Sequence, residues 1–261
     1  CTNRLTSPLY LVSIITSDRR SKEHVQVESA MRIQGVQKVS LLDFPRKVAC
    51  TVFTCGCNFR CPFCHNSSLV LPEEMQEDET DEEAFFDFLA TRRNKLDGVC
   101  VTGGEPLLQA DIEDFIRRIR SMGFAVKLDT NGSMPDRLKH LVNTGLVDYV
   151  AMDIKNSPEN YAKTVGCPNL SMDKIQESVD FLLSNTVPYE FRTTVVREFH
   201  TDRDMEHIGR WIKGANKYFL QEFVDSGSLI GEGLHAVSRK GEEVFRGIAS
   251  AYVPATELRG A

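Results

Sequence analysis

Three cysteines near residue 60 stand close enough together to bind a metal centre. Cys57, Cys61 and Cys64 have the spacing C-x3-C-x2-C. Thiolates are soft ligands that favour iron–sulfur clusters, zinc or copper(I). A structural zinc needs four ligands, and Cys55 or His65 could supply the fourth locally. A cubane cluster held by three cysteines instead leaves one iron open to a substrate, and this is the chemistry that the spacing favours.

Three further sequences could bind a ligand beside these cysteines. They are Gly103–Pro106 (GGEP), Asp129 and Asp153–Lys155 (DIK), and each follows a predicted strand. In parallel α/β folds the carboxyl ends of the strands meet at one edge, where ligands bind. Cys57 also follows a predicted strand, so we expect all four sequences to form one site.

Each of these sequences also has an ordinary structural interpretation. Glycines permit close backbone approach to a ligand, but GGEP also suits a tight turn before a helix. A buried Asp129 would need a partner, either a ligand ammonium or hydroxyl group or the turn at 131–132. Asp153 and Lys155 could form a solvated ion pair worth less than about 1 kcal/mol.

Alternating strands and helices position these residues. Apolar β-rich runs predict six strands, at Val48–Thr54, Gly98–Thr102, Ala125–Asp129, Asp148–Asp153, Tyr189–Val196 and Tyr218–Phe223. Helical periodicity predicts helices at Asp81–Arg93, Asp111–Met122, Pro135–Asn143, Met172–Leu182 and Asp202–Lys213, with one more after Glu232. These strands are too apolar to be half exposed, which indicates a parallel sheet covered by helices. The predicted class is α/β, a partial (β/α)6 TIM-like barrel of parallel strands with the site at the C-terminal strand ends.

Composition and charge argue against several classes of protein. The 261 residues are 41% hydrophobic and 26% charged, as in ordinary globular proteins. Lys and Arg number 31 and Asp and Glu 37, a net charge of −6 that disfavours a basic nucleic-acid surface. No apolar run approaches the roughly 20 residues of a membrane span. Cysteines crowded at Cys57–Cys64 indicate metal chemistry in a reducing compartment, so we expect a cytoplasmic protein.

The cysteine motif, with Phe63 before its last cysteine, resembles that of the radical S-adenosylmethionine (SAM) superfamily. GGEP resembles a segment that engages the SAM amino group in that family. The block Gly56–Asn66 (GCNFRCPFCHN) is similar to that of glycyl-radical-enzyme activating proteins. The runs Val39–Thr54, DTNG from Asp129 and MDIK from Met152 resemble the anaerobic ribonucleoside-triphosphate reductase activating type. The resemblance spans about residues 31–192.

The resemblance implies a set of cofactor contacts. Cys57, Cys61 and Cys64 would ligate a 4Fe–4S cluster, whose fourth iron would take the amino and carboxylate groups of SAM. SAM would be bound by Phe63, His65, Gly103, Gly104, Glu105, Asp129, Asp153 and Lys155. No catalytic residue is assigned beyond the cluster and SAM. Phe63 could equally be an ordinary core residue, and His65 a surface residue.

The resemblance also implies an activity and partners. The reduced cluster would cleave SAM to methionine and a 5′-deoxyadenosyl radical, making the protein a radical SAM oxidoreductase. The radical would take a hydrogen from a glycine of a glycyl radical enzyme, with anaerobic ribonucleotide reductase as the first candidate. An electron donor such as flavodoxin or ferredoxin is expected, with no nucleic-acid or membrane partner. Residues 31–261 would form one radical SAM domain, and residues 1–30 a non-native or disordered extension.

Four residues stand outside the pattern. Arg46 occupies a position where the family pattern leads us to expect glycine, and Cys55 adds a thiol before the first cluster cysteine. We interpret Cys55 as a passive small hydrophobic residue. His200 is a candidate second contact to SAM. Arg192, on the fifth predicted strand, is expected to face the barrel interior or its mouth, where a guanidinium needs an anionic partner.

Two other functions compete with the activating enzyme. A radical SAM enzyme acting on a small molecule or RNA is one, although no cysteines follow Cys167 to bind a further cluster. A zinc- or cluster-binding module without enzymatic activity is the other. The identity of the bound metal and the presence or absence of SAM cleavage would distinguish the non-enzymatic module from the two enzymes. The acidic run Glu73–Glu83 is expected to be a solvated loop and first helical turn.

Overall fold

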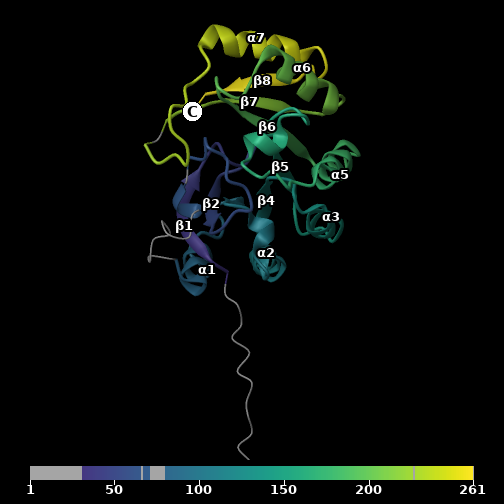
Figure 1. Ribbon diagram of the computed structural model, residues 1–261. Helices are drawn as coiled ribbons and strands as arrows, with labels where there is room; N and C mark the ends of the chain where they lie inside the picture. Colours follow the sequence, from purple (N-terminus) through teal and green to yellow (C-terminus); the bar gives the residue numbers. More distant parts are fainter. Residues whose placement is uncertain (1–30, 66, 71–79, 226, 261) are drawn as a thin grey trace, which may run out of the picture.

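The computed structural model describes residues 31–65, 67–70, 80–225 and 227–260, and these form an eight-stranded sheet with helices packed against it (Figure 1). The strands are β1 (Ile33–Ser40), β2 (Ala49–Thr54), β3 (Gly98–Gly103), β4 (Ala125–Thr130), β5 (Tyr149–Asp153), β6 (Tyr189–Val195), β7 (Tyr218–Glu222) and β8 (Thr256–Arg259). The helices are α1 (Glu82–Ala90), α2 (Ile112–Ser121), α3 (Pro135–Asn143), α4 (Tyr161–Thr164), α5 (Met172–Leu183), α6 (Asp202–Trp211) and α7 (Arg239–Ser250). Two short 3-10 turns are η1 (Ser67–Leu69) and η3 (Pro106–Leu108).

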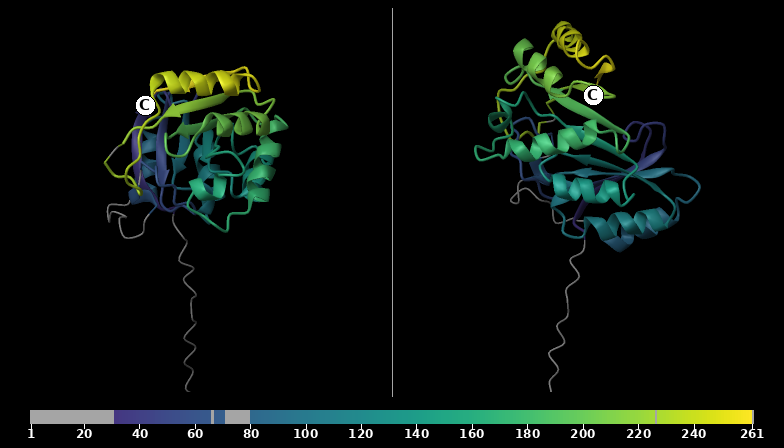
Figure 2. Two further views of the ribbon diagram at one scale, coloured as in Figure 1. Left: turned by 45° about the horizontal axis from the view of Figure 1, so that its top comes forward. Right: turned by 90° about the vertical axis from the view of Figure 1, so that its right-hand side faces the viewer.

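The strands lie in the sheet in the order in which they occur in the chain. β1 pairs antiparallel with β2, and every later pair is parallel. The sheet curves without closing, and helices lie on its outer side in both views of Figure 2. The predicted partial barrel of parallel strands is therefore confirmed, and all six predicted parallel strands are present as β2 to β7.

Three elements were absent from the sequence prediction. β1 reads IQGVQKVS, in which apolar and polar residues alternate too weakly to mark a strand. β8 has only four residues, TELR, and α4 is a single turn. The helix expected after Glu232 is present as α7, which packs on α6 beside β7 and β8.

The apolar stripe of each long helix explains how it covers the sheet. In α2 the side chains of Ile112, Phe115, Ile116 and Ile119 are all buried, at the spacing of one helical face. Local signals fix helix ends, since the Asp81 carboxylate accepts a hydrogen bond from the Ala84 N–H at the start of α1. Such capping and burial place α1 to α6 on the outside, leaving the strand ends open for a site.

Arg46 adopts a backbone conformation that favours glycine. Its φ is 61°, in the β1–β2 connection, so the family's preference for glycine at this position has a conformational reason here. The neighbouring Phe44 is buried and packs on Tyr149, with ring centroids 6.2 Å apart. This connection lies at the N-terminal ends of the parallel strands, opposite the edge at which the segment with Cys57–Cys64, the cysteine loop, follows β2.

Two sequence predictions fall on parts of the chain that are not described. Residues 1–30 lie outside the described residues, and so do positions 73–79 of the acidic run. In the described part, Asp81 to Glu83 start α1 as expected. No described helix is long and apolar enough to cross a membrane.

Candidate functional site: a cavity at the C-terminal strand ends

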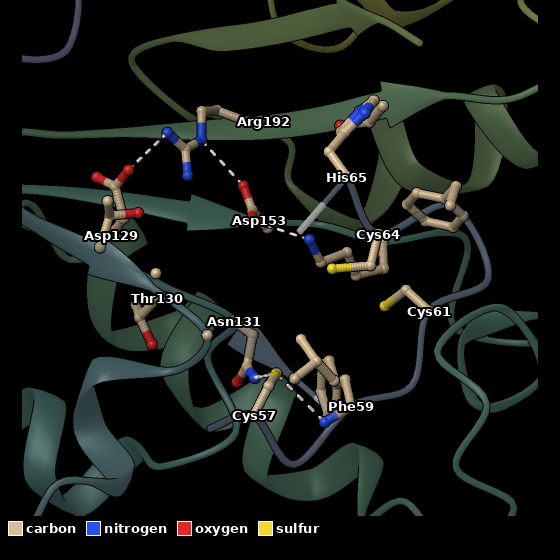
Figure 3. A pocket seen from close by; sticks show the side chains of 17 residues that line it. Cys57, Phe59, Cys61, Cys64, His65, Asp129, Thr130, Asn131, Asp153 and Arg192 are labelled. Atoms are coloured by element: carbon tan, nitrogen blue, oxygen red, sulfur yellow. Dashed lines mark hydrogen bonds and ion pairs between the residues drawn. The ribbon is translucent and has the colours of Figure 1, made fainter. Parts of the chain in front are cut away.

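The carboxyl ends of β2 to β6 surround one cavity of about 190 Å³ (Figure 3). Residues of the predicted site line much of it: Cys57, Cys61, Phe63, Cys64, His65, Gly103, Gly104, Asp129, Asp153 and Lys155. Arg192, expected from the sequence to face the barrel interior or its mouth, also lines the cavity. Six residues not singled out in the sequence complete the lining: Phe59, Val70, Thr102, Thr130, Asn131 and Thr194. Of the eleven predicted site residues, Glu105 is the one that does not line the cavity. The four sequences predicted to meet at one edge of the sheet do meet there.

The cysteine loop after β2 is held in place by backbone hydrogen bonds. The Gly56 N–H donates to the Leu69 carbonyl at 2.7 Å, and the Arg60 N–H to the Val165 carbonyl at 2.8 Å. The Gly231 N–H donates to the Pro62 carbonyl, also at 2.8 Å. Three separate parts of the chain therefore hold the loop, so the polypeptide itself sets the positions of the cysteines.

The three sulfurs lie around the cavity (Figure 3). Burial raises the pKa of Cys57 to about 11 and that of Cys61 to about 12, so neither ionises readily by itself. Binding iron would deprotonate such thiols, because a coordinated thiol loses its proton. Among the described residues, no group of three Cys, His, Asp or Glu side chains suits a single metal ion. Three thiols spaced around a cavity fit a cluster, in which each thiolate binds a different iron.

Gly104 permits the cysteine loop and the GGEP segment to lie against each other. A Cβ on Gly104 would lie 1.9 Å from the Gly56 carbonyl oxygen, and Gly103 has a φ of 122°. The Glu105 N–H donates to the Gly56 carbonyl at 2.8 Å, and the Gly104 N–H to the Thr54 carbonyl at 2.9 Å. Both glycines also line the cavity. Their small size therefore serves strand-end packing as well as access to a ligand.

Glu105 lies behind the cavity wall. It is fully buried and accepts hydrogen bonds from the Leu107 N–H, the Thr130 hydroxyl and the Asn131 N–H, at 3.0, 2.9 and 2.6 Å. Burial raises its pKa to about 7 despite these bonds. The carboxylate therefore holds the end of β4 against the GGEP turn, and the contact of Glu105 with SAM stays a prediction.

Five charged side chains form a continuous ion-pair network at the cavity floor, where four of them line the cavity and the buried Lys127 lies behind Asp129. Arg192 bridges two carboxylates, with Nη1 3.0 Å from Asp129 Oδ2 and Nε 2.9 Å from Asp153 Oδ1. Lys127 pairs with the other oxygen of Asp129, and Lys155 Nζ lies 2.9 Å from Asp153 Oδ2. Three cations thus face two carboxylates.

These pairs decide the charge state of both aspartates. Burial opposes their ionisation, but Arg192 and Lys155 outweigh it at Asp153 and lower its pKa to about 2. At Asp129, Arg192 and Lys127 likewise outweigh burial and lower the pKa. The floor therefore keeps its net charge of +1 at neutral pH, which favours binding of an anionic group.

The aromatic and histidine candidates occupy different places. Phe63 is buried and packs on Phe199 with ring centroids 5.6 Å apart, but it also borders the cavity. His65 borders the cavity and lies 5.6 Å from the Phe223 ring. Cys55 is buried outside the lining, with its sulfur 3.2 Å from Gln34 Oε1.

His200 does not line the cavity and acts on its floor through the backbone. The Val196 N–H donates to His200 Nδ1 at 3.0 Å, so Nε2 carries the proton and donates to the Lys155 carbonyl, also at 3.0 Å. Burial lowers the pKa of this histidine, which keeps it neutral. His200 therefore supports the loop that carries Lys155.

Comparisons with known proteins identify the family. The model of the radical SAM superfamily matches residues 51–212, which run from within β2 through the cysteine loop to the end of α6. The chain belongs to the radical SAM superfamily. A protein of Methanocaldococcus jannaschii named a glycyl-radical enzyme activating enzyme is 35% identical to it over 197 residues, covering 73% of this chain and 79% of the relative.

Solved radical SAM structures share the fold. A domain of pyruvate-formate lyase-activating enzyme from Bacteroides vulgatus matches with a TM-score of 0.52 at 16% identity, covering 62% of this chain and 99% of that one. Streptococcus suis SuiB bound to S-adenosylmethionine matches with a TM-score of 0.61 at 9% identity, covering 79% of this chain and 48% of that one. This radical SAM enzyme is an oxidoreductase whose cofactors are a 4Fe–4S cluster and SAM.

Proposed function

We propose that this radical SAM enzyme activates a glycyl radical enzyme, with anaerobic ribonucleoside-triphosphate reductase as the first candidate partner. When bound, the cluster and SAM supply a 5′-deoxyadenosyl radical, which takes a hydrogen from a glycine of the partner. The observation that carries the proposal is the meeting of three thiols and a cationic floor in one cavity at the strand ends.

Cys57, Cys61 and Cys64 would hold the cluster, since they are the cysteines that line the cavity. SAM would then lie between the cluster and the floor. Phe63, His65, Gly103 and Gly104 would form the walls around it, while Glu105 would act from behind the wall by holding the end of β4.

The floor would orient the amino-acid end of SAM by charge. Lys155 Nζ borders the cavity and, with three N–H groups and one described partner in Asp153, has donors left for a carboxylate. Asp153 and Asp129 stay ionised beside it and would accept hydrogen bonds from an ammonium group or from ribose hydroxyls. Arg192 keeps both aspartates in place.

The 35% identical relative supports a protein substrate, because the name it carries is that of an enzyme acting on another enzyme. The match covers 73% of this chain and 79% of the relative, so it extends over most of both proteins. A loop of the partner would enter the cavity mouth and exclude water from the radical. A small electron-donor protein such as flavodoxin or ferredoxin would reduce the cluster.

The test is anoxic reconstitution with iron and sulfide, followed by addition of dithionite and SAM. We expect 5′-deoxyadenosine in the unmodified protein and none above background in Cys61→Ala, with Cys167→Ala as a matched cysteine outside the cavity lining. Protein that carries a full reducible cluster yet forms no 5′-deoxyadenosine would contradict the proposal. Formation of 5′-deoxyadenosine without a glycyl radical on any partner would favour a small-molecule or RNA substrate.

A further inference from the structure

The side-chain amide of Asn131 lies between the end of β4 and the first cysteine of the loop. Asn131 is 5% exposed. Its Nδ2 lies 2.9 Å from Asn58 Oδ1 and 3.9 Å from Cys57 Sγ, and Figure 3 shows this amide nitrogen directed at the sulfur. Each of the two amide hydrogens therefore has a separate acceptor.

The orientation of this amide follows from a neighbouring backbone group. The Ser133 N–H donates to Asn131 Oδ1 at 2.9 Å. A side-chain amide nitrogen is a donor and could not accept this hydrogen bond. The oxygen must therefore face Ser133, which leaves the nitrogen facing Asn58 and Cys57. The reversed amide would place two donors together and leave the sulfur beside an oxygen.

Surrounding hydrogen bonds hold the amide in this position. Asn58 Nδ2 donates to Ser133 Oγ at 2.8 Å, which orients the Asn58 oxygen toward Asn131. The Asn131 backbone N–H donates to the buried Glu105 carboxylate at 2.6 Å. The N–H directed at Cys57 thus belongs to a rigid polar cluster formed by Asn58, Glu105, Asn131 and Ser133.

Cys57 differs from the other two cluster cysteines in receiving such donors. Its sulfur also accepts a hydrogen bond from the Phe59 backbone N–H at 3.4 Å. Within the described residues, no donor is found for the sulfurs of Cys61 or Cys64. Hydrogen bonds to cluster sulfurs stabilise the extra negative charge of the reduced state, and so raise the reduction potential.

We propose that Asn131 is a positioning residue that donates a hydrogen bond to the Cys57 thiolate and raises the reduction potential of the cluster. The inference rests on the proposed ligation of the cluster by Cys57. It assigns to Asn131 an effect on the electron-accepting step that needs no contact with SAM or a partner.

The experiment is an EPR-monitored redox titration of the reconstituted protein without SAM or partner. For Asn131→Ala we expect the ratio of reduced to oxidised cluster at a fixed potential to fall about tenfold, which for one electron is about 59 mV. Asn131→Gln keeps the amide and is expected to recover part of the loss. Asn143→Ala is the matched control, because it removes the amide of an exposed asparagine on α3 and leaves the polar cluster at Cys57 intact. Its potential is expected to match that of the unmodified protein.

Three outcomes would overturn the inference. One is an Asn131→Ala potential equal to that of the unmodified protein, and another is an equal shift in Asn143→Ala, which would show that the change does not depend on the amide at Cys57. If Asn131→Ala assembles no cluster, pulsed EPR of the unmodified protein carrying 15N in asparagine side chains decides instead. We expect a 15N coupling to the reduced cluster, and the absence of this coupling is the third outcome that would overturn the inference. Iron and sulfide content distinguishes these results from failure of the proposed function, since a protein that holds no cluster at all contradicts both.

Discussion

Replacing Arg192 by methionine tests whether the floor of the cavity is organised by ion pairs. The variant keeps a long side chain but removes the group that joins Asp129 to Asp153. Removing one partner of a buried ion pair typically costs about 3–5 kcal/mol. Each aspartate keeps one other cation, Lys127 or Lys155, so we expect the low end, about 3 kcal/mol at pH 7.

The pH dependence of this loss provides a sharper test. Asp153 has a folded-state pKa of about 2 against an ordinary value of 3.8. That difference corresponds to about 2 kcal/mol of stability, present above pH 4 and lost as the pH falls through 2. Protonated aspartates no longer attract Arg192, so the difference in unfolding free energy between the unmodified protein and the variant should shrink steadily below pH 4.

The assay is urea unfolding monitored by circular dichroism at pH 7, 5, 3.5 and 2.5, so that it covers the range over which Asp153 is protonated. Arg117→Met is the matched control, because Arg117 is exposed and pairs with Glu113 on the helix surface, where such a pair contributes little. We expect no measurable loss in that control at any pH. A loss in Arg192→Met no larger than in the control, or one that does not change with pH, would refute the account of the cavity floor.

Two further changes test the backbone features of the site and the fold. Gly104→Ala places a methyl group 1.9 Å from the Gly56 carbonyl oxygen, so we expect the cysteine loop to shift and the iron content after reconstitution to fall severalfold. Gly247→Ala, where nothing lies within 4 Å, should leave the iron content unchanged, and an equal fall there would contradict the steric argument. Arg46→Gly relieves a φ of 61° and should raise stability by about 0.5–1 kcal/mol. A melting temperature about 2 °C higher in calorimetry would show this gain, and a lower one would show that the Arg46 side chain stabilises the loop.

The parallel strands were predictable because each is short, apolar and followed by glycine or polar residues. Their order in the chain already implied that Cys57, Gly103, Asp129 and Asp153 would meet at one edge. β1 could not be predicted with the same means. Its strand character comes from antiparallel pairing with β2, and its own residues carry only weak alternation.

The partners of the charged residues were much less predictable than their positions. Arg192 was expected to need an anionic partner, but its pairing with Asp129 depends on the distance between β4 and β6 across the curved sheet. Lys127 is buried within a largely apolar strand, and its neighbours along the chain give no sign that its side chain forms a buried ion pair.

The position of Glu105 likewise follows from tertiary structure. The family resemblance associates this glutamate with SAM, whereas the fold turns its carboxylate toward Thr130 and Asn131. A hydrogen bond across 26 positions of sequence leaves no local signal. For the same reason Asn131, which contacts the cysteine loop, could be seen in the sequence only as part of a turn.

The most direct test of the central claim is an EPR spectrum of a candidate partner enzyme after anoxic incubation with the reconstituted, reduced protein and SAM. We expect the doublet of a glycyl radical. It should be absent with Cys61→Ala and absent when the partner's radical glycine is replaced by alanine. A chain that forms 5′-deoxyadenosine but yields no such doublet with any glycyl radical enzyme of its source would contradict its assignment as an activating enzyme.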